Sequence, residues 1–586
     1  KQFNKLYGLI DVNGAVFKTA EIVTQVKRFG ITVHPKFTLA NFLAQELTMP
    51  FISKTTYIPV VDGLKGIVWQ VKDKKIEKEF VESGQAQSTF VDADRQLFSA
   101  NKMREQIEKR DYIHTLDSKS PISSLLYSFE IMKRAGAKIG RLAQRPTVLT
   151  EQAPRIIAST QLKNKLLKNN KKLPTNEKLT KRQIDTLATY EGRDIIDFSR
   201  RGARMEAASR TNAFLNAGIQ GLYKISRTAT DPKQITKFAI TGIVGMTIPT
   251  IMNWYANRDS ETYKNTSDWE KLNFWVFVVN EEKGQYFTVR KPWELGWLFA
   301  TLPEKMLNYA YKTDKDYVNK MAKQWFEGAW SYFSNFIPVT DMFMPYFEEG
   351  FNRNMYTKRP IVSRSNENKL AEFQETPYTS EVAKKIGDGI RGIGNFIGIE
   401  GRNYGSPVKI DHYINAYTAT LGRDVIAGLD AIIKTFDKEA KDYIKPWSDD
   451  TFDKLTKIPV ANYFFRRTKL SAEPISKYWQ NYKKIRKYQG QVNELIEKGQ
   501  TQKAKELVGD FEVGLVQVMN KHTEKMQEKY NIYTLLQTRE VGKSDFTPQQ
   551  IDNLMDTTLK AILNHAKQVN ELVVNYEKNY KELKKQ

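Results

Sequence analysis

The sequence predicts a mainly α-helical protein, an elongated multi-helical architecture with one β-hairpin near 274–290 and a C-terminal helical bundle or coil. Glycine and proline number 32 and 20 among 586 residues. Because they are fewer than in an average protein, long regular elements are favoured over short turns. Apolar residues recur at three- and four-residue steps in several stretches, which is the spacing of one helix face. With 40% of its residues hydrophobic, the chain can bury a substantial core.

The first part of the chain, 1–161, is predicted to be helical, and a basic linker is predicted at 162–182. Ser120-Pro121 begins one helix, because a capping residue precedes proline at the first helical position. The linker carries one acid, Glu177, and has Pro174 near its centre. Its basic residues are Lys163, Lys165, Lys168, Lys171, Lys172, Lys178, Lys181 and Arg182.

A central helical region, 183–435, carries the hairpin. Two runs rich in β-branched and aromatic residues, 274–279 and 286–290, flank a polar loop that contains glycine, a pattern typical of two paired strands. A connector is predicted at 436–470. The glycine-rich stretch 391–407 within the central region is predicted to be a loop.

The last part, 471–586, is predicted to be a bundle of long helices. Thr547-Pro548-Gln549-Gln550 has the pattern of a capping box, and apolar residues follow it at helical steps as far as Leu583. Two further helices are predicted before it, over 473–498 and 501–539. Helices of this length and pattern favour a bundle or an extended coil.

The residue inventory argues against most catalytic chemistries. With no Cys, the chain has no disulfide, Cys-bound metal or Cys nucleophile, and its five His are scattered. The HExxH, P-loop and G-x-S-x-G patterns are absent. Weak patterns are Gly392-x-Gly394 with Gly398 for phosphate, and Asp92-x-Asp94 and Asp314-x-Asp316 for a metal. We favour the interpretation that the glycines lie in a flexible loop and that the Asp pairs are solvated positions. We expect no catalytic residue, metal or cofactor. The hypothesis of an enzyme with residues distant in sequence stays open.

Charge favours an anionic partner. The chain has 91 Lys and Arg against 67 Asp and Glu, a net charge of +24, which suits nucleic acid or an anionic lipid surface. A basic cluster, Lys477, Lys483, Lys484, Arg486 and Lys487, is interleaved with aromatic residues. Its Tyr478, Trp479, Tyr482 and Tyr488 could stack on bases, or could pack inward beneath a solvated face. The candidate phosphate contacts are Lys163, Lys165, Lys168, Lys171, Lys172, Lys181, Arg182, Arg200, Arg201, Arg204, Lys483, Lys484, Arg486 and Lys487.

One apolar run, 238–257, has no charge over twenty residues and lies between Lys237 and Arg258. Its length and flanks suit a membrane segment, but its Thr, Asn, Gly and Pro also suit a buried core helix, so both interpretations stay open. The membrane-segment candidates are Phe238, Ile240, Ile243, Val244, Ile248, Ile251, Trp254 and Tyr255. A second aromatic stretch, 325–336, is more typical of core packing than of a membrane interface.

Five short motifs occur in a characteristic order. They are 34–41 (HPKFTLAN), 197–202 (DFSRRG), 290–296 (RKPWELG), 358–362 (KRPIV) and 406–411 (SPVKID). Their order and spacing resemble the large polyvalent protein-associated domain of bacteriophages, from about residue 20 to about residue 435. The chain departs from that pattern at Gln45-Glu46, where an Arg-Asp pair is expected.

The resemblance implies a segment of a very large phage polypeptide that is carried in the capsid and delivered with the genome. The start Lys1-Gln2-Phe3 also suggests an excised piece, and no secretory signal pattern is present near it. We expect a non-enzymatic internal virion protein that helps form a conduit for DNA across the host envelope. Its expected location is the virion, in the capsid interior or the portal and tail region, and then the host cell envelope after ejection.

Several partners are expected for such a protein. They are phage DNA bound non-specifically, other virion proteins such as portal or core proteins, further copies of the chain in a homo-oligomer, and the host envelope membrane. The alternative is a structural or DNA-packing head protein that does not contact membrane. A chain without crosslinks suits passage between compartments, and a basic chain suits proximity to DNA.

Overall fold

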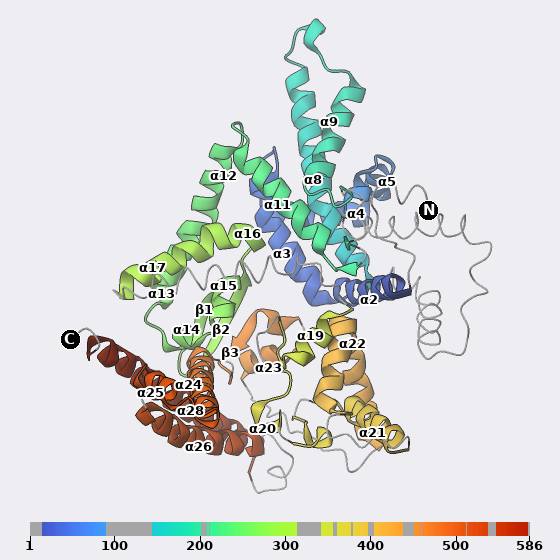
Figure 1. Cartoon of the computed structure of the whole chain (residues 1–586). Helices are drawn as coiled ribbons and strands as arrows, with labels where there is room; N and C mark the ends of the chain where they lie inside the picture. The colour runs from blue at the N-terminus through green and yellow to red at the C-terminus, as the bar shows by residue number, and fades with distance from the viewer. Residues whose placement is uncertain are drawn as a thin grey trace. The chain divides into compact units, whose positions relative to one another are not determined.

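A computed structural model gives the fold of this chain (Figure 1). It describes residues 15–89, 143–200, 205, 208–209, 211–312, 342–355, 360–367, 369–376, 379–396, 404–436, 450–458, 460–470, 472–510, 513–536 and 546–583. Helices dominate these residues, so the predicted mainly α class is confirmed. The expected elongated outline stays a prediction.

The chain divides into two compact units. The first comprises Lys1–Ile251, Arg290–Glu375 and Val382–Asp430, and the second comprises Met252–Val289, Thr376–Glu381 and Ala431–Gln586. The division expected from the sequence into 1–161, 162–182, 183–435, 436–470 and 471–586 stays a prediction.

The first unit is built from helices. Its longer ones are α2 (Ala15–Thr32), α3 (Pro35–Ile52), α4 (Val61–Lys72), α5 (Lys74–Glu82), α8 (Arg145–Asn170), α9 (Lys181–Asp194), α11 (Leu215–Thr230), α12 (Ile235–Gly242), α17 (Leu302–Lys312), α21 (Glu381–Phe396) and α22 (Pro407–Phe436), whose end lies in the second unit. Its short elements are η1 (Gln85–Ser88), η3 (Thr175–Glu177), η4 (Ile243–Thr247), α16 (Trp293–Gly296), η5 (Trp297–Thr301), α19 (Met344–Gly350), α20 (Arg364–Glu367) and η7 (Ala371–Phe373). α13 (Ile248–Asn257) continues η4 and ends in the second unit.

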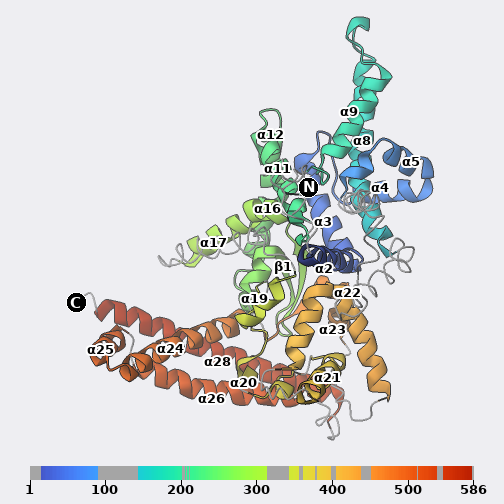
Figure 2. The same ribbon diagram turned by 45° about the vertical axis from the view of Figure 1, so that its right-hand side comes forward.

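The predicted linker is the distal part of a helical hairpin. α8 continues to Asn170, so its last two turns cover half of 162–182, and α9 already begins at Lys181. Pro174 and the neighbouring polar residues mark only the short turn, while Thr180 and Gln183 form a capping box that begins α9. α8 and α9 lie side by side, and their tip stands away from the other helices of the unit (Figure 1, Figure 2).

The second unit holds a small sheet. β1 (Phe274–Asn280) and β2 (Gln285–Arg290) confirm the predicted hairpin, and the sheet has the order β1-β2-β3. β3 (Phe465–Arg467) pairs antiparallel with β2, with Phe465 opposite Phe287. Gly284 turns the hairpin with φ of 61°, and a Cβ there would lie 2.8 Å from the hydroxyl of Thr468. Short helices α14 (Glu261–Asn265), α15 (Asp268–Asn273), α23 (Thr451–Lys457) and η8 (Ala461–Tyr463) accompany the sheet.

The C-terminal bundle is also confirmed. It consists of α24 (Glu473–Glu497), α25 (Thr501–Asp510), α26 (Val513–Leu536) and α28 (Pro548–Leu583). Gln550 accepts the backbone N–H of Thr547 at 2.7 Å, which confirms the capping box. Ile562, Ala566 and Val569 of α28 are fully buried in a core shared with α24 and α26. The predicted helix 501–539 is two helices, α25 and α26.

Several predictions lie outside the described residues. They concern Ser120-Pro121, the aromatic stretch 325–336, Asp92, Asp94, Asp314, Asp316, Arg201, Arg204 and Gly398. The predicted loop 391–407 is partly wrong, because its first residues are the last turns of α21.

Candidate functional site

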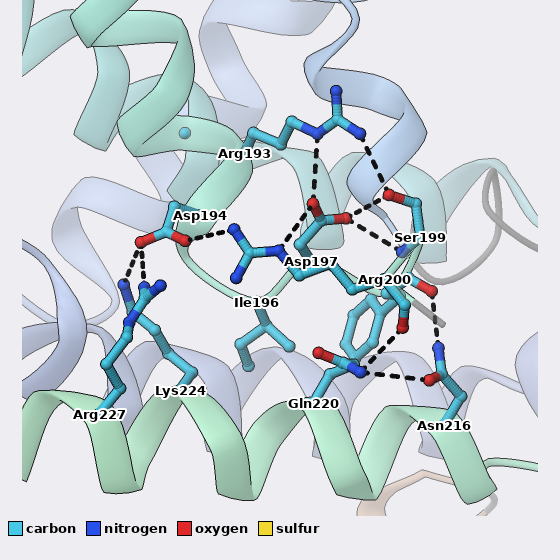
Figure 3. Close-up of polar contacts among 12 residues, drawn as sticks. Arg193, Asp194, Ile196, Asp197, Ser199, Arg200, Asn216, Gln220, Lys224 and Arg227 are labelled. Carbon is cyan, nitrogen blue, oxygen red and sulfur yellow. Dashed lines mark hydrogen bonds and ion pairs between the residues drawn. The ribbon is translucent and has the colours of Figure 1, made fainter. Parts of the chain in front are cut away.

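A charged cluster joins α9 to α11 in the first unit (Figure 3). The carboxylate of Asp194, the last residue of α9, is 3% exposed. It accepts hydrogen bonds from Lys224 Nζ at 3.0 Å, from Arg200 Nη2 at 3.0 Å and from Arg227. Lys224 is itself 5% exposed at its side chain, so this ion pair is buried. Three cations from two segments therefore share one carboxylate.

Asp197 organises the turn that follows α9. Its Oδ1 accepts the backbone N–H of Ser199 at 3.0 Å and its Oδ2 accepts Arg193 Nε at 3.2 Å. Arg200 Nε lies 3.5 Å from Asp197, so Arg200 contacts both carboxylates. The 197–202 motif thus supplies an acid that shapes the turn and an arginine that connects it to Asp194.

Side chains of α11 hold the same turn through its carbonyl groups. Asn216 Nδ2 donates to Phe198 O at 2.7 Å, and Gln220 Nε2 donates to Arg200 O at 2.8 Å. Two carbonyl groups of this partly buried turn thus have side-chain donors from α11. The cluster is therefore a structural connection first, and its outer guanidinium groups are the part that can attract anions.

The pKa values agree with this arrangement. Burial alone would raise the pKa of Asp194, but Lys224 and Arg227 together hold it below its ordinary value. Burial lowers the pKa of Lys224 more than the charge of Asp194 raises it. The pKa of Arg227 is raised despite its partial burial, because it hydrogen-bonds to Asp194, so the two bases of α11 differ: burial prevails at Lys224 and the carboxylate prevails at Arg227.

The α8–α9 tip carries the other predicted phosphate contacts of this unit. Lys163 is paired with Asp185 at 2.8 Å, with both side chains 41% exposed. The remaining candidates there are exposed: Lys165, Lys168, Lys171, Lys172, Lys181 and Arg182. Lys178 is exposed too, and Glu177 is the only acid in the turn. We call these seven exposed cations the basic tip. It can attract phosphates without rearrangement of side chains.

The basic cluster with interleaved aromatic residues lies on α24. Lys483, Lys484, Arg486 and Lys487 are exposed. Tyr478 is fully buried and lies beside the hydroxyl of Thr523 at 2.9 Å, while Trp479 packs edge-to-face against Tyr482 and Tyr530. The base-stacking hypothesis is therefore wrong for Tyr478. Trp479 and Tyr482 pack against the bundle core and are partly buried, so stacking by these two rings and by Tyr488 stays a prediction. The charged face itself stays a candidate phosphate contact.

The apolar run forms one continuous helix, Ile235–Asn257, through α12, η4 and α13. In the described part of the chain it alone is long and apolar enough to cross a membrane, and 22% of its most apolar window is buried. The interpretation as a buried core helix is thus wrong for most of its surface. Of the membrane-segment candidates, Ile240, Ile243, Val244, Ile248, Ile251 and Tyr255 are exposed, whereas Phe238 and Trp254 are buried.

The sequence does not predict two further contacts between distant residues. The rings of Phe238, Phe51 and Phe299 form a cluster with centroids 5.3–5.7 Å apart, which seats α12 on α3 and η5. His522 and His565, 43 residues apart, meet with ring nitrogens 3.3 Å from each other between α26 and α28. The described residues hold no group of three or more metal-ligating side chains.

Comparison with known proteins gives one family match. Residues 260–450 match the model of large polyvalent protein associated domain 38. No curated protein and no solved structure matches the chain. Three of the five motifs, 290–296, 358–362 and 406–411, lie in the matched segment, while 34–41 and 197–202 lie outside it. The resemblance to large polyvalent protein-associated domains, a bacteriophage-associated class, is therefore confirmed for residues 260–450.

Proposed function

We propose that this chain is a non-enzymatic internal virion protein of a bacteriophage, ejected with the genome and part of a conduit for DNA across the host envelope. The match at 260–450 supports the association with phage. The net charge of +24 supports proximity to DNA. Further copies of the chain, portal or core proteins and the host membrane are the proposed partners, and the virion followed by the host envelope is the proposed location.

The observation that carries the proposal is the exposed apolar surface of helix Ile235–Asn257. Large exposed apolar patches on a folded chain mark interaction sites, because leaving them in water has a free-energy cost. A protein that only packs DNA inside a head has no need of such a surface. A conduit protein needs both a basic surface for DNA and an apolar one for the envelope.

Imaging of phage particles tests the proposal. Particles that carry a tagged copy of the chain are imaged before and after DNA release is triggered by receptor. We expect density for the tag inside the full particle and its loss from the emptied one. A tag that stays in the emptied particle would contradict ejection, and a tag absent from full particles would contradict a virion role altogether.

A structural or DNA-packing head protein is the second candidate, and the basic tip favours it. Charge reversal of Lys168, Lys171 and Lys172 to Glu should weaken DNA binding and lower the slope of log affinity against log salt by about 0.9 for each phosphate that the variant no longer neutralises. The matched control reverses three exposed lysines of α4 and α5, Lys72, Lys74 and Lys75. An equal change of slope in both triple variants would show that the tip has no special role.

A further inference from the structure

We propose that the exposed face of helix Ile235–Asn257 docks onto an anionic lipid surface with the helix lying in the plane of the membrane interface. The proposal rests on the proposed function only for its biological setting, in which the chain contacts the membrane of the host envelope. Its physical basis is the distribution of polar and apolar side chains around this helix.

The helix is apolar on its outer side and polar on part of its inner side. Thr250 and Asn253 are buried on α13, as is Asn257. Asn257 donates to the carbonyl of Asn253 at 2.7 Å, and its own Oδ1 accepts Val278 N at 3.1 Å. A surface helix of a protein in water usually has the opposite arrangement. This one therefore suits an apolar medium on its outer side.

The outer face is continuous. Its members recur at steps of three or four residues, so they share one side of the helix. They are Ile240, Val244, Ile248, Ile251 and Tyr255, with Ile243 and Met252 beside them. Val244 is 59% exposed. We call these residues the apolar face. At 1.5 Å per residue it extends over about 22 Å.

Contacts within the first unit hold the N-terminal half of the helix. Lys237 Nζ donates to the carbonyls of Ser53 at 2.6 Å and Thr55 at 3.0 Å. Thr247 Oγ1 donates to Phe299 O at 2.7 Å, and a Cβ on Gly242 would lie 2.3 Å from the Phe299 ring. A helix that spanned the membrane would have to break these contacts. Docking by the apolar face leaves them intact.

Charge identifies lipid as the occupant rather than a second copy of the chain. No acidic residue occurs between Ile235 and Arg258. Arg258, at the C-terminal end, lies 4.4 Å over the ring of Tyr255, and Lys233 is exposed before the N-terminal end. Asp231 lies two residues before Lys233 and Arg258 pairs with Asp259 at 3.4 Å, but the helix itself holds one cation, Lys237, and no acid, so two copies of this face bring no opposite charges together along it. Anionic head groups can bind Lys233 and Arg258 at the two ends of the helix, and acyl chains can pack against the apolar face between them.

The test exploits the absence of Cys from the chain. Single Cys residues at Val244, Ile248 and Tyr255 receive an environment-sensitive fluorophore, and the full chain is mixed with vesicles of phosphatidylcholine with or without phosphatidylserine. We expect a blue shift at all three sites, stronger with phosphatidylserine, at one common shallow depth by lipid-attached quenchers. A depth that changes steadily along the helix would indicate spanning and overturn the in-plane mode.

A substitution pair completes the test. Val244→Asp with Ile248→Asp should lower vesicle affinity by about tenfold or more, since each change places a charge in the interface. The control Val574→Asp changes an apolar residue of α28 that is 57% exposed and should leave affinity unchanged. Equal binding by the double variant, or lipid-free self-association that this variant abolishes, would overturn the proposal. Particle imaging tests the proposed function separately, so either can fail while the other stands.

Discussion

Replacement of Asp194 by Ala should destabilise the connection between α9 and α11 more than any single surface change. The substitution leaves Lys224, with 5% of its side chain exposed, as a buried cation without its carboxylate. Loss of one partner of a buried ion pair costs about 3–5 kcal/mol of unfolding free energy. Arg200 and Arg227 add little, because each has about a third of its side chain in solvent and can be rehydrated.

Urea unfolding combined with hydrogen exchange of the α9 and α11 amides measures this effect locally. The matched control is Asp185→Ala, which removes a surface partner of Lys163 and should cost less than about 1 kcal/mol. Asp194→Ala with Lys224→Met removes both buried charges and should recover more than half of the loss. A cost of about 1 kcal/mol for the single variant, or no recovery in the double variant, would refute the reasoning.

Two further predictions concern α3 and α4. Burial raises the pKa of Glu46 to about 7, so its stabilising contribution is full below pH 4.5 and is lost as pH rises to about 7, by about 3 kcal/mol. Urea titrations of Glu46→Gln should lack that slope, and an unchanged slope would contradict the assignment. Gly66→Ala places a Cβ 2.6 Å from the Ala153 carbonyl and should lower the melting temperature by the equivalent of about 1–3 kcal/mol, whereas Gly221→Ala, in open space, should raise it slightly. Equal melting temperatures for the two variants would show that α4 and α8 approach less closely.

The sequence predicted elements whose signals are local. The capping box at Thr547 and the apolar steps behind it located α28, and the β-rich runs located β1 and β2. β3 was missed because it has three residues and depends on its pairing with β2. The last turns of α8 are not predicted, because a run of Lys with few apolar residues indicates a linker by charge although Lys is a good helix former.

The cluster at Asp194 could be predicted only in part. The 197–202 motif indicated that this turn matters, but Lys224 lies thirty residues away and meets Asp194 only through the packing of α11. The sequence of the charge-free run contains a pattern that predicts the apolar face, but its overall composition does not show that pattern. Thr250, Asn253 and Asn257 recur at helical steps within the charge-free run, which predicts one polar side. A hydropathy value averaged over the whole run does not show this spacing.

The structure also restricts which part of the +24 charge can reach DNA. Several cations of the first unit are committed to carbonyl groups at helix ends, where the backbone dipole favours positive charge. Arg155 donates to Ile196 O at 2.7 Å just beyond α9, and Lys237 donates to two carbonyls just beyond α3. Arg28, also buried, donates to the carbonyls of Ser209 and Asn212.

These charges stabilise the fold and are poorly placed for phosphates. Net charge alone therefore overstates the charge available for binding in this unit, and among its described residues the basic tip is where exposed cations exceed acids most clearly. If DNA binding depends on this unit, its salt dependence should follow the tip rather than the total charge.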